Sequence, residues 1–233
     1  MNIYITGDTH RDFDRVRSFC EKTGTTKDDI MIILGDAGIN YYLFGYDASL
    51  KAELETLPIT LFCIHGNHEE RPRNIPSYKE SEWHGGIVYT EPEYPSLIFA
   101  KDGEIYDFCG QKYIVLGGAY SVDKYIRQLR GYQWFESEQP DDEIKAYAES
   151  RLEKAGWRVD GVLSHTVPLE YLPLQALLTD IDQSRVDHST EEWLGEIEKK
   201  LTYKYWYAGH FHVDCTSGPI KLMFGSIEEL PRE

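Results

Sequence analysis

Three apolar runs in the first 70 residues alternate with segments of helical periodicity, and this alternation restricts the fold more than any other feature of the sequence. The runs occupy residues 2–6, 30–34 and 59–63. One helical pattern begins near Asp12, and a second covers about 47–57. Strands that alternate with helices predict parallel pairing in a sheet covered by those helices. Taken alone, the pattern favours one doubly wound parallel sheet.

Polar groups follow each of these three strands directly. The strand ends read Gly7-Asp8-Thr9-His10, Gly35-Asp36 and Gly66-Asn67-His68-Glu69. Any one of them could be an ordinary polar turn. However, the carboxyl ends of neighbouring parallel strands meet at one edge of a sheet. We therefore expect five side chains to lie close together: Asp8, His10, Asp36, Asn67 and His68.

The second half of the chain contains further strand-like runs, and histidines follow two of them. Ser164-His165 ends one run, and Gly209-His210-Phe211-His212 ends another. Apolar runs predict strands and helical spacing predicts helices. The expected strands are 112–116, 159–163, 203–208 and about 220–224, and the expected helices are about 140–154 and 190–200.

Two regions are less regular than the rest. Pro and Gly punctuate short β-like pieces between about 71 and 110, which predicts hairpins or a meander, and residues 119–139 are expected to form a loop rich in Tyr, Arg and Trp. The absence of repeats and of linker-like composition predicts one domain over 1–233. Its irregular parts, about 71–135 and 168–189, are expected to wall the site and set substrate choice.

The strand-end residues are of the types that hold intermediate metal ions. Carboxylate and amide oxygens combined with imidazole nitrogens suit Mn²⁺, Fe or Zn²⁺. Alternate residues of an extended segment point the same way, so His210 and His212 can address one location. The set is larger than one ion uses, which indicates two ions that share a carboxylate. Two ions about 3.5–4 Å apart can hold a hydroxide between them and stabilise in-line displacement at phosphorus.

Net charge and hydropathy exclude several partners. The formal charge of −16 argues against non-specific binding to nucleic acid or to an anionic membrane. A small phosphorylated substrate stays compatible with that charge, because bound cations reverse the local field. No apolar run approaches the roughly 20 residues that span a bilayer. Because residues 2–6 look like a strand and no signal peptide is evident, a cytoplasmic location is predicted.

The combined motifs resemble the calcineurin-like metallophosphoesterases. The order Gly-Asp-x-His, Gly-Asp, Gly-Asn-His-Glu, His and Gly-His-x-His extends from Gly7 to His212, so the resemblance covers nearly the whole chain. It implies a four-layer α/β/β/α sandwich in which two mixed β-sheets pack face to face, in place of a single sheet.

The resemblance also implies a role for each strand-end residue. His68 would be the catalytic histidine that does not bind metal and that protonates the leaving oxygen or stabilises the transition state. Asp36 would bridge the two ions, with Mn²⁺ as the expected metal and Fe or Zn²⁺ as alternatives. One ion would be held by Asp8, His10, Asp36 and His212, and the other by Asp36, Asn67, His165 and His210.

The second motif departs from that of the phosphoprotein phosphatases in this superfamily. Those enzymes carry Gly-Asp-x-x-Asp-Arg-Gly, whereas residues 35–41 read Gly-Asp-Ala-Gly-Ile-Asn-Tyr. The acid that would orient the catalytic histidine and the arginine that would grip phosphate are both missing. Charge-assisted contacts to phosphate could come from other cations instead. The candidates are Arg11, Arg71 and Arg127, with Arg73, Lys124 and Arg130 as further cations nearby in the sequence.

These features predict a metal-dependent phosphoester hydrolase, and a phosphomonoesterase is the favoured form. A phosphodiesterase or nuclease of the same superfamily is the closest alternative, because the motifs do not encode how the site treats a second ester substituent. A non-catalytic metal-binding module is the alternative from another class. That module would be expected to have lost His68 or several ligands, and this sequence keeps them all.

Overall fold

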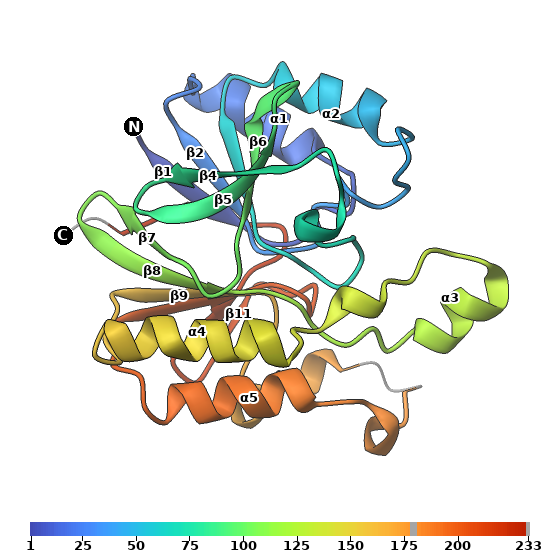
Figure 1. Cartoon of the computed structure of the whole chain (residues 1–233), viewed down its shortest axis with the longest axis vertical. Coiled ribbons are helices and arrows are strands. Elements are labelled where there is room, and N and C mark those ends of the chain that lie inside the picture. The colour runs from blue at the N-terminus through green and yellow to red at the C-terminus, as the bar shows by residue number, and fades with distance from the viewer. Residues whose placement is uncertain (178–180, 232–233) are drawn as a thin grey trace.

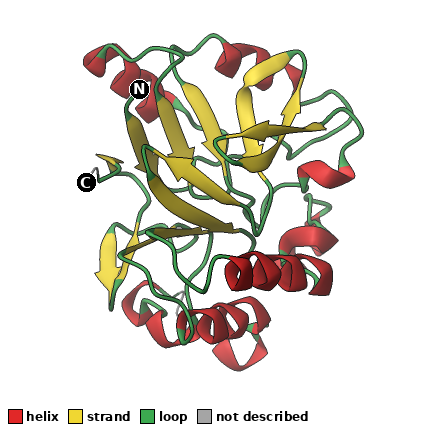
Figure 2. Cartoon of the chain, turned by 60° about the vertical axis from the view of Figure 1, so that its left-hand side comes forward, coloured by secondary structure: helices red, strands yellow, loops and turns green. Residues whose placement is uncertain are grey.

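The computed structural model describes residues 1–177 and 181–231, which form two β-sheets packed face to face with helices on both outer faces (Figures 1 and 2). This is the layered fold that the family resemblance implies, and the single parallel sheet expected from the alternation alone is wrong. The first sheet has the order β13 (Ile227–Glu229), β1 (Ile3–Thr6), β2 (Ile30–Ile33), β3 (Thr60–Cys63), β6 (Tyr94–Ala100), β5 (Gly86–Glu91) and β4 (Lys79–Trp83).

Both sheets are mixed. In the first sheet β1, β2, β3 and β6 are parallel, whereas β13, β5 and β4 pair antiparallel to their neighbours. In the second sheet the four inner strands are parallel and the two edge strands are antiparallel. That sheet has the order β11 (Cys215–Ser217), β12 (Ile220–Leu222), β10 (Tyr205–Ala208), β9 (Gly161–Ser164), β8 (Gln111–Leu116) and β7 (Ile105–Phe108).

The helices form the two outer layers, except for one that projects to the side. In Figure 1, α1 (Asp14–Thr23) and α2 (Ala48–Glu55) cover the first sheet, and α4 (Asp142–Lys154) and α5 (Ser189–Glu198) cover the second. The short helix α3 (Lys124–Arg130) extends away from the layers. The described 3₁₀ turns are η1 (Pro72–Asn74), η2 (Glu136–Glu138), η3 (Leu169–Tyr171), η4 (Leu174–Ala176) and η5 (Gln183–Arg185).

Strand β2 shows why the continuous apolar runs suit this architecture. Ile30 and Ile32 join the core between the sheets, whereas Met31 and Ile33 join the core beneath α1 and α2. Both faces of the strand are therefore buried, as a run without polar alternation predicts. A third core beneath α4 and α5 includes Val162 of the second sheet. An apolar run such as that of β2 does not show whether a helix or a second sheet covers each face of the strand. For this reason the alternation of strands and helices alone predicted one sheet instead of two.

The elements missed by the sequence are short or exposed. Helix α3 lies within the expected loop 119–139, and none of its seven described residues is buried, so it has no apolar stripe to reveal it. It ends at Gly131, whose positive φ of 68° is typical of a helix end. The strands β11 and β13 were also missed, and each has only three residues. Among the described residues, no helix combines the length and apolarity needed to cross a bilayer.

Candidate metal centre and catalytic pocket

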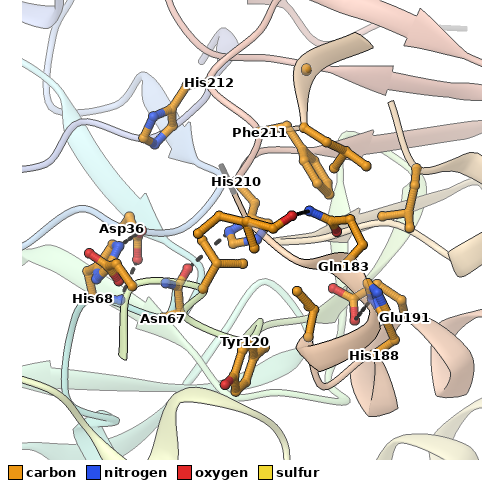
Figure 3. Close-up of a pocket in the computed structure, with 17 residues that line it drawn as sticks. Asp36, Asn67, His68, Tyr120, Gln183, His188, Glu191, His210, Phe211 and His212 are labelled. Atoms are coloured by element: carbon orange, nitrogen blue, oxygen red, sulfur yellow. Dashed lines mark hydrogen bonds and ion pairs between the residues drawn. The ribbon is translucent and has the colours of Figure 1, made fainter. Parts of the chain in front are cut away.

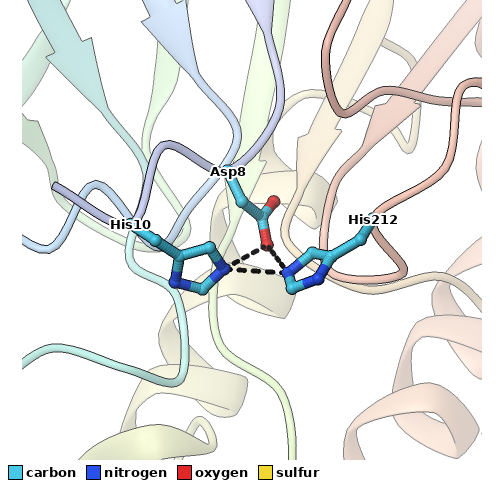
Figure 4. A group of neighbouring side chains, drawn as sticks. All are labelled: Asp8, His10 and His212. Atoms are coloured by element: carbon cyan, nitrogen blue, oxygen red, sulfur yellow. Dashed lines mark hydrogen bonds and ion pairs between the residues drawn. The ribbon is translucent and has the colours of Figure 1, made fainter. Parts of the chain in front are cut away.

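Asp8, His10 and His212 form the first cluster of possible metal ligands (Figure 4). The Nε2 atoms of His10 and His212 are 2.8 Å apart. Asp8 Oδ2 lies 3.3 Å from His212 Nε2 and 3.7 Å from His10 Nε2. Asp8 and His10 follow β1 and His212 follows β10, so the two sheets contribute jointly. Three potential ligand atoms this close together suit a cation.

Asn67, His165 and His210 form a second cluster. Asn67 Oδ1 lies 2.8 Å from His165 Nε2 and 3.1 Å from His210 Nδ1. His165 Nδ1 donates to the carbonyl oxygen of Leu34 at 2.8 Å, so a neutral His165 ring has only a lone pair at Nε2. That lone pair then faces Asn67 Oδ1, which also can only accept a hydrogen bond. A metal ion bound to both atoms would satisfy this arrangement. The bond to Leu34 fixes the ring as outer-shell partners of metal-bound histidines do.

Two buried carboxylates lie between these clusters. Asp36 Oδ2 is 3.9 Å from His10 Nε2 in the first cluster and 3.7 Å from His165 Nε2 in the second. Asp8 also has an oxygen close to both Asp36 and His165. Asp8 Oδ2 is buried and has no hydrogen-bond partner among the described residues. A buried carboxylate oxygen without a partner is costly, and a bound cation would remove that cost.

The surroundings of His210 keep its ring nitrogen available for a metal ion. Burial, together with the adjacent His165, lowers the pKa of His210 to about 3. The ring is therefore neutral at pH 7, which metal binding requires. Glu69, which sequence reasoning left without a role, is also buried and accepts from the backbone N–H groups of Ala37 and Gly38 at 3.3 and 3.2 Å. Burial and the nearby Asp36 raise the pKa of Glu69 to about 8.

The backbone around the clusters is strained at several ligand positions. Positive φ is uncommon outside glycine and is often retained at functional sites. Two glycines of the motifs leave room for the neighbouring side chains of Asp36 and His165. A Cβ on Gly66 would lie 2.0 Å from Asp36 Oδ1, and one on Gly35 would lie 2.1 Å from His165 Nδ1. The strand-end residues in the left-handed region are His10 (φ 45°), Asp36 (φ 48°), His210 (φ 70°) and His212 (φ 51°).

His68 is next to the clusters, and Arg127 contacts it. The backbone N–H of His68 donates to Asp36 Oδ1 at 2.7 Å, and its Nε2 atom is 3.3 Å from Arg127 Nη2. Arg127 Nε in turn donates to Asp123 Oδ2 at 2.7 Å. Burial, opposed by Asp36 and assisted by Arg127, lowers the pKa of His68. A neutral ring can accept from Arg127, so the chain Asp123–Arg127–His68 links α3 to the site.

The other two predicted phosphate contacts are held elsewhere. Arg71 is only 2% exposed, pairs with Asp102 and donates through Nε to the Ser137 carbonyl at 2.8 Å. Its guanidinium is buried and lines a separate cavity with His65 and Asp102, and its contact with substrate stays a prediction. Asp102 lies 31 residues away, and no sequence pattern had marked it. Arg11 Nη1 donates to Gly38 and Asp47, both at 2.6 Å, and its contact with substrate stays a prediction.

A cavity of about 290 Å³ opens beside the clusters (Figure 3). In Figure 3, Asn67 and His68 lie on one side of it, and Gln183 and His188 lie on the other. The wall also includes Asp36, the segment His210–His212, Glu191 of α5, and these residues of the two irregular regions: Tyr120, Val122, Asp123, Leu172, Ala176, Leu177, Ile181 and Val186. The expected irregular regions therefore reach the site in part, whereas β4 to β7 do not line the cavity. Residues 178–180 of the expected region 168–189 lie outside the described residues.

The fold resembles solved structures at low sequence identity. One solved structure has a TM-score of 0.51 and 12% identity over 95% of this chain and 89% of its own. TT1561 of Thermus thermophilus has a TM-score of 0.48 and 13% identity, covering 97% and 96% of the two chains. Phosphopantetheinyl hydrolase (PptH) from Mycobacterium tuberculosis has a TM-score of 0.43 and 14% identity, covering 96% and 88%. No curated protein matches the sequence.

The sequence itself matches the family model described as calcineurin-like phosphoesterase over residues 1–214. That range contains every strand-end motif and both ligand clusters. The chain therefore belongs to the calcineurin-like phosphoesterase family, and it is a metal-dependent hydrolase of phosphoester bonds.

Proposed function

We propose that this protein is a phosphomonoesterase that works with two metal ions held by the strand-end clusters. The observation that carries the proposal is the convergence of carboxylate, amide and imidazole atoms at the strand ends, where Asn67 Oδ1 faces the Nε2 lone pair of a neutral His165 and Asp8 Oδ2 is buried. The proposed ligands are Asp8, His10, Asp36 and His212 for one ion, and Asp36, Asn67, His165 and His210 for the other.

Bound there, two ions supply Lewis-acid polarisation of the phosphoryl group and a water nucleophile at neutral pH. The chain's own residues do the rest. His68 lies at the edge of the clusters, where its ring can exchange a proton with the leaving oxygen. Arg127 places a positive charge beside His68, and its other donors hold it to Asp123, to the Tyr41 hydroxyl and to the carbonyl oxygen of Gln133.

Arg127 also favours a monoester over a diester. A phosphomonoester carries more negative charge than a diester, and a guanidinium next to the catalytic histidine stabilises that additional charge. Hydrolysis by the Mn²⁺-loaded protein of p-nitrophenyl phosphate and of bis-p-nitrophenyl phosphate tests the preference. We expect the larger kcat/KM on the monoester. A larger value on the diester would make the protein a phosphodiesterase, and hydrolysis of neither ester would overturn the proposed function.

Replacing Arg127 with Ala is expected to lower kcat/KM on p-nitrophenyl phosphate by about 10- to 100-fold, because hydrogen bonds to charged groups contribute about 1.5–3 kcal/mol. Arg127→Lys should recover only part of the loss, since an ammonium keeps the charge without the planar fork. Steady-state kinetics separate the effects on kcat and KM.

Arg130→Ala is the matched control, because Arg130 lies on the same helix and is exposed. It should hydrolyse the ester as the wild type does. Equal kinetics for Arg127→Ala and Arg130→Ala would remove Arg127 from the site.

Three further expectations accompany this proposal. Mn²⁺ as the metal, a cytoplasmic location and a single domain over residues 1–233 all stay predictions. The phosphorylated substrate is the proposed partner, and the charge of −16 continues to disfavour non-specific nucleic-acid binding. A non-catalytic module is disfavoured because the chain keeps His68 as well as the whole ligand set.

A further inference from the structure

The cavity beside the clusters has both polar and apolar lining. Its polar groups come from the strand ends and, on the other side, from Gln183, His188 and Glu191, whereas Leu172, Leu177, Val186 and Phe211 form an apolar wall. Phosphate chemistry at the clusters requires only the polar groups. The apolar wall therefore needs an explanation from the part of the substrate that does not react.

The apolar wall continues outward along α3. A groove of about 640 Å³ shares Tyr120, Val122, Ile181 and Val186 with the cavity, so the two spaces adjoin. It adds the α3 side chains Tyr125 and Ile126, and its remaining lining residues are Asp182 and Arg185. Six of its eight lining residues are thus apolar or aromatic.

Helix α3 directs different side chains towards His68 and towards the groove. Arg127 turns towards His68, whereas the adjacent Ile126 is 47% exposed and Tyr125 is 74% exposed. Exposed apolar side chains that gather in a groove commonly mark a binding surface. Figure 1 shows α3 projecting from the layers, and its exposed apolar side chains contribute nothing to the three cores of the fold.

We propose that this groove binds the organic part of the substrate, so that the substrate is a phosphoester of an alcohol with an extended apolar chain. The inference rests on the proposed function, because it takes the clusters as the place of the phosphoryl group. The four lining residues that the groove shares with the cavity favour the substrate's own chain over a separate protein partner. Asp182 and Arg185 keep the groove polar at one point, which suits an amphiphilic molecule.

Alkylphosphonates of increasing length test this inference, because they carry the charged head but cannot be hydrolysed. Isothermal titration of the Mn²⁺-loaded protein with ethyl-, butyl-, hexyl- and octylphosphonate measures each Kd below micelle-forming concentrations. Kd is expected to fall by up to about fourfold per buried methylene. The ratio of the ethyl to the octyl Kd should therefore exceed about tenfold even with partial burial.

Ile126→Ser should reduce that ratio several-fold, because it places a hydroxyl in the groove. Leu129→Ser is the matched control, since Leu129 lies on the same helix, is 72% exposed and does not line the groove. The control should keep the wild-type ratio. An equal ratio in Ile126→Ser and in the wild type would overturn the role of the groove.

The two proposals fail in different ways. Hydrolysis of p-nitrophenyl phosphate together with a Kd that does not depend on chain length would overturn the apolar substrate and leave the phosphoesterase intact. Chain-length-dependent binding without hydrolysis of either nitrophenyl ester would overturn the proposed function and leave an apolar ligand groove. Binding of every phosphonate with a ratio near one would likewise remove the groove from recognition.

Discussion

Replacing His68 with Ala is expected to lower kcat by at least ~10²-fold, the usual scale of acid–base assistance, while both metal ions stay bound. His68 Nε2 lies 3.3 Å from Arg127 Nη2, and His68 belongs to neither of the two ligand clusters. Its removal should therefore take away a proton-transfer group without emptying a metal site. Steady-state turnover of p-nitrophenyl phosphate and elemental analysis of the same sample measure the two quantities.

His84→Ala is the control for the loss of one imidazole, because His84 precedes β5 and does not line the cavity. It should keep wild-type turnover and metal content. Unchanged turnover in His68→Ala would remove His68 from the mechanism. Loss of metal in His68→Ala would make it a ligand instead, which would also contradict its assignment as the histidine that does not bind metal.

The ligand clusters could be predicted from sequence because their geometry follows from local rules. A parallel strand fixes where its carboxyl end lies, so residues directly after β1, β2 and β3 meet at one edge whatever the intervening loops contain. The same rule applies to His165 after β9 and His210 after β10. This rule applies within one sheet, so it does not predict that the strands belong to two sheets.

The partners of the arginines could not be predicted in the same way. Asp102 lies in a turn before β7, and nothing in its neighbourhood marks it as the partner of Arg71. Arg127 was one of several candidate cations, and only the placement of α3 brings it to His68. That helix has no buried side, so its position depends on contacts such as those of Arg127 with His68 and Tyr41 rather than on a hydrophobic pattern.

Asp36→Ala is expected to lose both metal ions and nearly all activity, whereas Asp8→Ala is expected to lose one ion. Asp36 Oδ2 lies 3.9 and 3.7 Å from histidines of the two clusters, and Asp36 Oδ1 also holds the backbone of His68. Asp8 belongs to the cluster with His10 and His212, and Asn67, His165 and His210 would keep the other ion in its absence. Elemental analysis after dialysis gives the number of ions per chain.

Two further measurements separate metal loss from unfolding. Circular dichroism should show native secondary structure in both variants, because the three cores do not include either aspartate. Asp36→Asn, which keeps an oxygen ligand but removes the charge, should bind metal more weakly than the wild type and more tightly than Asp36→Ala. If Asp8→Ala lost both ions and Asp36→Ala kept one, Asp8 would be the bridging carboxylate. Asp8 has an oxygen close to His10 and His212 and one close to Asp36 and His165, which makes that the specific alternative.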